Sequence, residues 1–456
     1  MGRNVHGACR RIRVTTRDTV RKVASAVGRA VAWLAACTAL LVSEASCRCD
    51  LGSPPSTSAP PSVSASAGDN SSHPGANAMP SSAINERGRR ARMVSADDGG
   101  TCVISSGNLY CWGAPLGNEE FWVPFRLAPS GMRFDHVSRA GGHVCARTAD
   151  GQAWCAGRNS YGELGGPSVD KCGVGPFRDG TVEYHPCSQL LLRVPEIGPV
   201  VDVVAGVNRT CAILDNGRVS CWGAHHEARE QPLQARSARQ IEGLSNVAQL
   251  ALGDFFGCAL LTDGTVRCWG SNQQGQLGQG NSDDSIRNAA QRVSGVDGAV
   301  AISAGSSHAC AVSNGVHGQR LHCWGSSLRG QIGMAEPCDK GICSQPISVA
   351  LPEAIGRIRD LALGGQTTCA LSEDGSLYCM GEQAPHAIAG QLRKVAGVPS
   401  LVSVAIGGSH ITGISHTGVV LSWGETTLRD EAAHTVKCDG CASPLIEVPG
   451  ITVASP

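Results

Sequence analysis

The sequence predicts an all-β fold, a seven-bladed β-propeller of four-stranded blades closed by the C-terminal strand. The first observation is composition: of 456 residues, 58 are Gly, 17% are charged and 4% are aromatic. Such a chain is not a coiled coil, a helical bundle or a protein with many membrane spans. The second is a Cys-Trp-Gly unit that recurs along the chain. The third is a total of 22 cysteines, which indicates an oxidising compartment.

The repeating unit occurs seven times. Its clearest copy, residues 252–280, contains Cys-Ala-x-Leu-x-Asp-Gly-x-Val-x-Cys-Trp-Gly. Steps of 43 to 66 residues separate the closing glycines, and such a period is typical of propellers and solenoids. The closing glycines are Gly113, Gly157, Gly223, Gly270, Gly325, Gly381 and Gly424.

Each unit is predicted to contain one β-hairpin. Asp-Gly or Asn-Gly between two alternating runs is the strongest short signal for such a turn. A hairpin with flanking strands makes a four-stranded blade. Turn geometry also explains the repeated carboxylates, so they do not indicate acid–base catalysis. The turn dipeptides are Asp150-Gly151, Asn216-Gly217, Asp263-Gly264, Asn314-Gly315 and Asp374-Gly375.

A second motif, Gly-x-Leu-Gly, follows three of the units, at 162–165, 275–278 and, with Ile for Leu, 330–333. In this order, the motifs over roughly residues 92–450 resemble the regulator of chromosome condensation (RCC1-like) repeat family, of an exported bacterial type. The resemblance implies a seven-bladed propeller. Four units lack a clean Gly-x-Leu-Gly, and Ala156 and Met380 replace the Trp in units two and six.

The C-terminal tail is expected to close the ring. Residues 444–453 resemble the segment that precedes each unit, such as 346–349. Unit one begins almost directly after a linker, with little chain before it. We therefore expect the tail to supply the outer part of blade one, which would also remove an exposed sheet edge.

Residues 1–46 are predicted to be an export signal. Eight basic residues and one acidic residue in 1–29 precede the apolar run 30–42, which is too short for a membrane span. Cleavage after Ala45 would yield a secreted protein. Leu34-Ala35-Ala36-Cys37 resembles a lipobox, so the alternative is membrane attachment through a lipid anchor on Cys37.

The rest of the chain divides in two. Residues 47–83, rich in Pro, Ser, Ala and Gly, are expected to form a disordered linker, and 84–456 the propeller. Residues 51–456 contain 29 basic and 35 acidic side chains. This mildly acidic body is not expected to bind nucleic acid.

Six cysteine pairs flank the hairpin turns. Facing positions there lie within disulfide reach, and unit seven replaces both members together, by Thr412 and Ser422. We expect disulfides; the alternative is six pairs of small buried thiols. The pairs are Cys102 and Cys111, Cys145 and Cys155, Cys211 and Cys221, Cys258 and Cys268, Cys310 and Cys323, and Cys369 and Cys379.

Three further pairs lie in inter-blade loops and are expected to staple loops on one rim. A redox or metal site is the alternative for the last of them, which is a Cys-x-x-Cys motif. A thioredoxin-like motif needs a strand–helix context that is missing here, and zinc needs two more ligands. The pairs are Cys172 and Cys187, Cys338 and Cys343, and Cys438 and Cys441.

Three histidines occupy one repeat position, two residues before the first hairpin cysteine: His143, His308 and His410. Equivalent positions in a propeller form a ring, which raises the hypothesis of a three-His metal site. Their units are not adjacent, and resemblance to the family favours a hydrogen bond to a neighbouring blade. The sequence also contains no phosphate-binding loop and no zincin motif. We therefore expect no metal and no cofactor.

Function is predicted from the loops. We expect a monomeric, non-catalytic scaffold that binds an unidentified protein at the cell envelope, displayed there or secreted. Insertions at 158–190, 224–240 and 326–345 lie between units, where loops on a rigid ring carry recognition. The candidate binding residues are Tyr161, Phe177, Tyr184, His225, His226 and Arg229.

Two other functions stay open at this point. A lyase or glycan-active enzyme using the axial face would need His and Glu from several blades gathered on that face. Resemblance to the family implies guanine-nucleotide exchange on a small GTPase, which conflicts with an export signal. The family also includes a secreted β-lactamase inhibitor, so the fold also acts outside the cell.

Overall fold

The structure is a computed structural model in which all described residues belong to one compact unit, residues 77–456. The expected signal and linker lie outside the described residues. The described ranges are 93–113, 121–168, 170–174, 182–224, 238–316, 318–333, 338–382, 390–424, 435–436 and 445–453.

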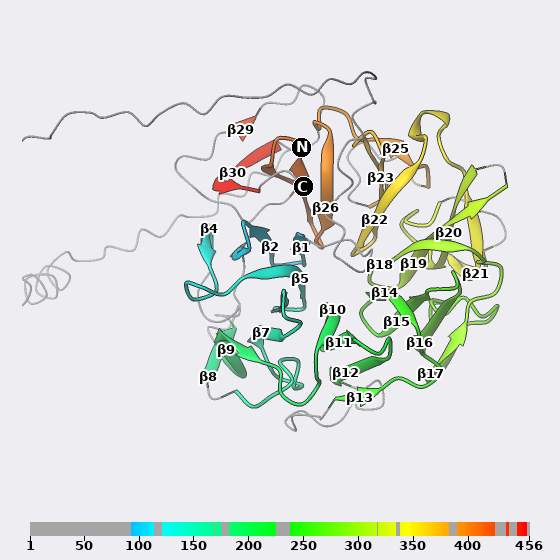
Figure 1. Ribbon diagram of the computed structural model, residues 1–456. Helices are drawn as coiled ribbons and strands as arrows, with labels where there is room; N and C mark the ends of the chain where they lie inside the picture. The colour runs from blue at the N-terminus through cyan, green and yellow to red at the C-terminus, as the bar shows by residue number, and fades with distance from the viewer. Residues whose placement is uncertain are drawn as a thin grey trace, which may run out of the picture. The chain divides into compact units, whose positions relative to one another are not determined.

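Seven antiparallel sheets surround a central axis, which confirms the predicted seven-bladed propeller (Figure 1). The first four strands of each sheet run from the innermost strand outward in chain order, except that in blades two and seven an added edge strand precedes the fourth strand in the chain. Blade one consists of β1 (Val94–Ala96), β2 (Gly100–Ser105), β3 (Asn108–Gly113) and β4 (Phe121–Arg126). Blade two consists of β5 (Phe134–Ala140), β6 (His143–Thr148), β7 (Ala153–Arg158), β9 (Glu183–Arg193) and an added edge strand β8 (Asp170–Val174). Blade three consists of β10 (Val200–Gly206), β11 (Arg209–Leu214), β12 (Val219–Gly223) and β13 (Arg239–Gln240).

Blades four to seven repeat this order. They consist of β14 (Val247–Leu252), β15 (Phe256–Leu261), β16 (Val266–Asn272) and β17 (Asp283–Arg292); β18 (Ala299–Ala304), β19 (His308–Gly315), β20 (Gly318–Ser326) and β21 (Ile342–Val349); β22 (Ile358–Gly364), β23 (Thr367–Ser372), β24 (Leu377–Gly381) and β25 (Arg393–Lys394); and β26 (Leu401–Ile406), β27 (His410–Ser415), β28 (Val419–Gly424), β30 (Leu445–Thr452) and an added strand β29 (Thr435–Val436). The described ranges hold one short 3-10 helix, η1 (Glu353–Ile355), and no helix that could cross a membrane.

The predicted hairpin turns join the second and third strands of the blades. Gly217 adopts φ of +75°, a left-handed conformation that favours glycine, and its N–H donates to the Leu214 carbonyl at 2.9 Å. The fifth hairpin differs from the prediction. There β19 and β20 pair as far as Gly315 and Gly318, so the turn lies beyond Asn314-Gly315 because three extra residues lengthen the hairpin.

The core lies between adjacent blades. The five Trp residues of the Trp-Gly motif are at most 4% exposed. Trp222 Nε1 donates to the Glu163 carbonyl at 2.8 Å, and Trp324 Nε1 donates to the Gln276 carbonyl at 2.9 Å. Each of these acceptors lies in the Gly-x-Leu-Gly turn of the preceding blade. In these two interfaces the Trp-Gly motif supplies the ring and the Gly-x-Leu-Gly turn supplies its hydrogen-bond acceptor.

The expectation for the C-terminal tail is wrong in its detail. Strand β30 pairs with β28 of blade seven, with Leu421 opposite Glu447, and blade one has its own outer strand β4. The tail still joins the two ends of the ring, because Ile446 and Val448 pack in one cluster with Val94 of blade one. The prediction failed because the segment 121–126 of blade one was not identified as a strand.

Candidate functional site

All long insertions leave the propeller on one face. In blade two, His143 at the start of β6 lies opposite Gly157 near the end of β7, so the insertion after Arg158 lies beside the turn that joins β5 to β6. The same register holds in the other blades. We call this side the insertion face. The opposite side carries the turns between the second and third strands and is called the hairpin face.

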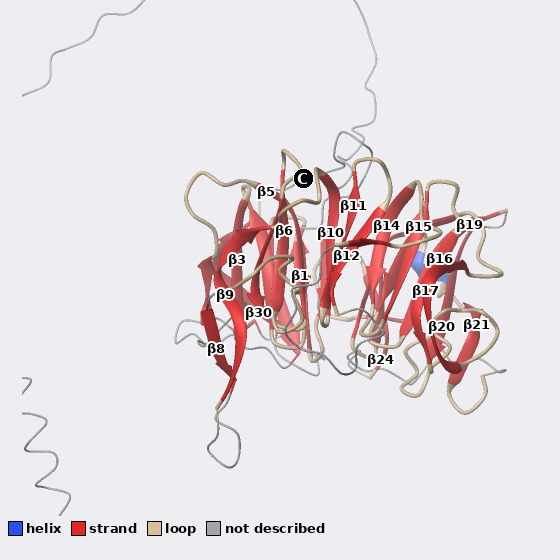
Figure 2. Cartoon of the chain, turned by 90° about the horizontal axis from the view of Figure 1, so that it is seen from below, coloured by secondary structure: helices blue, strands red, loops and turns tan. Residues whose placement is uncertain are grey.

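Two disulfides staple the described parts of these insertions. Cys172 and Cys187 join β8 to β9, with Cα atoms 5.8 Å apart, and Figure 2 shows this hairpin projecting beyond the ring. Cys338 and Cys343 close a loop before β21. The third expected pair, Cys438 and Cys441, lies outside the described residues.

Six disulfides join the second and third strands of blades one to six, so these cysteines are not the pairs of free buried thiols considered as the alternative. In each, the two facing residues have Cα atoms 4.0–4.1 Å apart. The bonds join Cys102 to Cys111, Cys145 to Cys155, Cys211 to Cys221, Cys258 to Cys268, Cys310 to Cys323, and Cys369 to Cys379.

Blade seven has a polar pair in place of this disulfide. The hydroxyls of Thr412 and Ser422 lie 3.3 Å apart at the matching positions. The hairpin disulfides are buried between blades and fix the scaffold, whereas the two loop disulfides fix the insertion face.

Two of the six candidate binding residues are described. Tyr184 lies on β9 and is 64% exposed. Tyr161 is half-buried in the turn after β7, where its backbone N–H donates to Glu163 Oε2 at 2.7 Å. Phe177, His225, His226 and Arg229 lie outside the described residues. Tyr161 and Tyr184 therefore belong to the same blade and the same face.

Glu163 caps this turn from the inside. Its side chain is fully buried, and Arg158 Nε lies 3.3 Å from Oε1. Burial raises the pKa of Glu163, although backbone hydrogen bonds and Arg158 oppose the shift. Gln276 occupies the equivalent position in blade four, and its Oε1 accepts the Gln274 N–H at 2.7 Å. A neutral amide serves equally well there, so the role of Glu163 is structural.

A cavity of about 570 Å³ runs along the axis and is lined by the innermost strands of all seven blades. Figure 1 shows these strands arranged around the axis. Each innermost strand has one neighbouring strand, so N–H groups on its other edge point toward the axis. Side chains of the preceding blade accept several of them: Ser95 Oγ from Arg139, Ser138 Oγ from Ala205 and Ser303 Oγ from Leu363, at 2.9 to 3.2 Å. The wall is thus joined from blade to blade.

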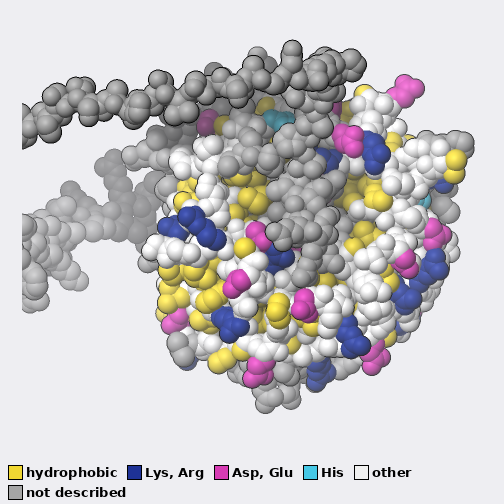
Figure 3. All heavy atoms as spheres, in the orientation of Figure 1, with side chains coloured by type: hydrophobic (Ala, Val, Ile, Leu, Met, Phe, Trp, Pro, Cys, Tyr) yellow, Lys and Arg dark blue, Asp and Glu magenta, His cyan; other side chains and the backbone are white. Residues whose placement is uncertain are grey.

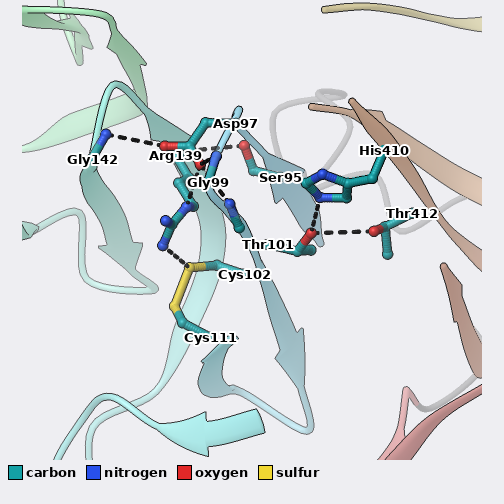
Figure 4. Close-up of polar contacts among 11 residues, drawn as sticks. Ser95, Asp97, Gly99, Thr101, Cys102, Cys111, Arg139, Gly142, His410 and Thr412 are labelled. Atoms are coloured by element: carbon teal, nitrogen blue, oxygen red, sulfur yellow. Dashed lines mark hydrogen bonds and ion pairs between the residues drawn. A yellow bond between two sulfur atoms is a disulfide. The ribbon is translucent and has the colours of Figure 1, made fainter. Parts of the chain in front are cut away.

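An ion pair joins blades one and two beside this cavity (Figure 4). Arg139 Nε donates to Asp97 Oδ1 at 2.8 Å, and the Gly142 N–H donates to Oδ2 at 3.1 Å. The Arg139 side chain is 1% exposed. Burial alone would raise the pKa of Asp97, but the charge and hydrogen bonds of Arg139 and the backbone donors Gly142 and Gly99 bring it below its usual value.

The insertion-face end of the cavity is a ring of seven turn residues, one from each blade. Two of them, Asp98 and Asp254, are carboxylates, and they come from blades one and four. Burial and the neighbouring Asp97 raise the pKa of Asp98. Burial also raises the pKa of Asp254 to about 6, with a contribution from Asp98. The ring consists of Asp98, Gly141, Val207, Asp254, Ser306, Gly365 and Gly408.

The three equivalent histidines join blades and do not form a metal site. Nε2 of each lies 2.8–2.9 Å from a Thr hydroxyl on the next blade, which confirms the interpretation as an inter-blade hydrogen bond. Burial lowers the pKa of His143 and His308 to about 3 and that of His410 to about 4. The pairs are His143 with Thr210, His308 with Thr368 and His410 with Thr101 (Figure 4).

The arrangement is suited to binding. The histidines are buried, neutral and bonded, so they are not accessible to a substrate as acids or bases. Within the described ranges, no group of three His, Cys, Asp or Glu side chains could hold a metal ion. The accessible polar groups at the insertion face are the mouth carboxylates and the loop side chains.

Sequence reasoning missed Asp98 and Asp254. Both lie in the glycine-rich segment before the first hairpin cysteine of their units. At the equivalent position, three other units have Gly141, Gly365 and Gly408. An acidic residue where other units carry glycine is visible once the units are aligned.

Comparisons with known proteins agree with this fold. Sequence profiles described as the regulator of chromosome condensation (RCC1) repeat match residues 141–163, 200–227, 247–276, 358–383 and 263–312. The chain is 26% identical over 382 residues to the guanine nucleotide exchange factor SRM1 of Saccharomyces cerevisiae, covering 70% of this chain and 77% of the relative.

Two solved structures are similar in fold. A chain in the crystal structure of Kap60 bound to yeast RCC1 (Prp20) is 22% identical, with a TM-score of 0.61, over 85% of this chain and 97% of that one. Prp20p from Saccharomyces cerevisiae, described with its binding to Gsp1p and histones, is 23% identical, with a TM-score of 0.60, over 77% of this chain and 93% of that one. The chain thus contains RCC1 repeats and has the propeller architecture of these relatives.

Proposed function

We propose that this protein is a non-catalytic scaffold, displayed outside the cytoplasm, that binds a partner protein through its insertion face. One observation carries the proposal: the long insertions leave a rigid ring on a single face, and the two loop disulfides of the described ranges lie on that face. Loops held by a rigid scaffold are the usual sites of recognition. Stapling them reduces the ordering entropy that binding costs.

Disulfide content supports a place outside the cytoplasm. Eight disulfides lie in the described part of the chain, and disulfides persist in oxidising compartments. The basic and apolar N-terminal sequence supports the same conclusion. The chain enters the ring at Met93, whose carbonyl accepts the Ile104 N–H beside the first hairpin turn. The described part of the chain therefore begins at the hairpin face.

The relatives support a protein partner. The names of the similar structures include protein partners, Kap60, Gsp1p and histones. Guanine-nucleotide exchange is the alternative that the yeast relative suggests. The disulfides weigh against it because small GTPases reside in compartments where thiols stay reduced.

Affinity capture tests the proposal. The exported, oxidised full chain would be immobilised and exposed to an envelope extract, with the reduced and unfolded chain as the control. We expect one protein retained in stoichiometric amount. Tyr184→Ala on the insertion face should weaken retention, whereas Val316→Ala on the hairpin face, where the side chain is 98% exposed, should not. No retained protein, or equal sensitivity to both variants, would contradict the proposal.

A further inference from the structure

The insertion-face end of the axial cavity holds two carboxylates, Asp98 and Asp254, and the charge of the buried Arg209 acts on the second of them. Neither Asp98 nor Asp254 takes part in an ion pair with any residue in the described ranges. At the hairpin-face end, by contrast, Asp202 Oδ1 lies 2.7 Å from His136 Nε2. The two ends of one cavity therefore differ in whether a histidine lies within ion-pair distance of a carboxylate.

The mouth is kept clear of side chains by glycine. A Cβ atom on Gly408 would lie 1.8 Å from Asp98 Oδ1, and one on Gly141 would lie 2.0 Å from the Val207 carbonyl oxygen. Contacts this short exclude any larger residue. Access to the carboxylates along the axis is thus built into the packing of the turns.

The arginines nearest this mouth are bonded to other groups. Arg139 is paired with Asp97 inside the wall. Arg209 is 5% exposed, and its Nη2 donates to the carbonyl oxygens of Gly253, at 3.2 Å, and Phe256. Their positive charges are held behind the backbone, so the surface that faces the solvent at the mouth is negative.

Asp254 is the more buried carboxylate. Desolvation raises its pKa to about 6, and the charge of Asp98 adds to the shift. A hydrogen bond from the Ser306 hydroxyl and the charge of the buried Arg209 oppose it. Two carboxylates that repel one another in a partly desolvated site are stabilised by a cation placed between them. The next residue, Phe255, is 57% exposed, so an aromatic ring stands beside the acidic mouth. Aromatic faces attract ammonium and guanidinium groups.

We infer that the mouth receives an arginine or lysine side chain of the partner protein, with an adjacent apolar residue of that partner packed on Phe255. This inference rests on the proposed function and names the chemistry of its partner. Asp98 and Asp254 bind the cation from two sides of the axis, and its methylene chain runs back through the mouth to the backbone of the partner. The carboxylates set specificity for a positive charge, and Phe255 adds apolar contact.

A peptide titration tests the charge requirement on the exported full chain. The probes are acetylated, amidated Gly-Leu-Arg-Leu-Gly and the same peptide with citrulline, which has the shape of arginine without its charge. We expect the Arg peptide to bind about tenfold more tightly, equivalent to about 1.4 kcal/mol. The preference should shrink with added salt, and also below pH 6 as Asp254 takes up a proton.

Variants locate the site. Asp98→Asn/Asp254→Asn should remove the preference for arginine over citrulline. The control Asp215→Asn/Glu242→Gln removes two exposed carboxylates elsewhere and should keep it. Equal binding of the two peptides to the wild type, no binding at millimolar concentration, or a preference that survives Asp98→Asn/Asp254→Asn would each overturn the inference.

Repeating the capture with these variants separates this inference from the proposed function. A partner held by the wild type and lost at least tenfold by Asp98→Asn/Asp254→Asn, but not by the control, supports both. A partner held equally by all three chains leaves the binding scaffold standing and refutes the acidic mouth as its contact. A chain that captures nothing counts against the proposed function, and the peptide titration then decides on the mouth alone.

Discussion

Acidification should weaken the fold through the three inter-blade histidines. In the unfolded chain these side chains protonate near pH 6.5, but in the folded protein their pKa lies at about 3 to 4. Below pH 6.5 the unfolded state therefore binds more protons, and stability falls as pH falls. Each histidine removes about 1.4 kcal/mol per pH unit, so three remove about 6 kcal/mol between pH 6.5 and 5. That loss is comparable to the total stability of many domains.

One carboxylate acts in the opposite direction. The pKa of Asp254 is about 6 when folded and 3.8 as the ordinary value, so its protonation favours the folded state as pH falls from 6. By pH 5 this offsets about 1.4 kcal/mol of the loss, which leaves about 5 kcal/mol.

The interface between blades four and five shows how one of the histidines can be replaced without creating a cavity. In blade four the equivalent position is Phe256, which packs with Ala309 of blade five. The variant His308→Phe/Thr368→Ala copies this pair at the next interface. Urea unfolding between pH 7.5 and 5, with disulfides intact, should show the dependence on pH reduced by about one third. Val316→Ala, at a 98% exposed side chain that does not titrate, is the control and should leave the slope as it is. An unchanged slope in His308→Phe/Thr368→Ala would refute the assignment of the pH dependence to these histidines.

Three further predictions concern stability. Asp254→Asn should raise the free energy of unfolding by about 1–3 kcal/mol at pH 7.5, where the native carboxylate is charged, and the gain should fade between about pH 6 and pH 4 as that carboxylate takes up a proton; no gain by urea unfolding would contradict the desolvation argument. Trp324→Ala, at a fully buried ring, should cost about 3–5 kcal/mol, and a loss below 1 kcal/mol would mean the interface is not close-packed. Cys369→Thr/Cys379→Ser copies the pair found in blade seven and should cost about 2–4 kcal/mol while keeping the fold; loss of the native circular dichroism spectrum would show that blade six depends on its disulfide.

Much of the fold could be predicted from the sequence because its signals are local. A turn such as Asn216-Gly217 fixes a hairpin by backbone conformation alone, and Cys211 and Cys221 then face one another by register. The tail was misplaced for the opposite reason. Strand β4 of blade one lies after a segment of irregular length, and nothing local distinguishes a tail that completes blade seven from one that completes blade one.

The candidate site was less predictable. Sequence analysis pointed to the insertions, and strand direction places them on one face, but four of the six residues chosen there lie outside the described ranges. The mouth carboxylates escaped notice because Asp98 and Asp254 are 156 residues apart, and only ring closure brings their blades to opposite sides of one axis. A feature produced by seven repeats together leaves little trace in any one repeat.

Figure 3 shows the described side chains on the face seen in Figure 1, where acidic and basic groups are interspersed around the ring.

Hydrogen exchange on the complex with the captured partner tests most directly whether the insertion face is the binding surface. We predict slower exchange in the turns 140–143 and 253–256 and in the β8–β9 hairpin, with no change in the hairpin-face turns such as 215–218. Protection confined to the hairpin-face turns, with the insertion face unchanged, would contradict the proposed binding surface and the acidic mouth together.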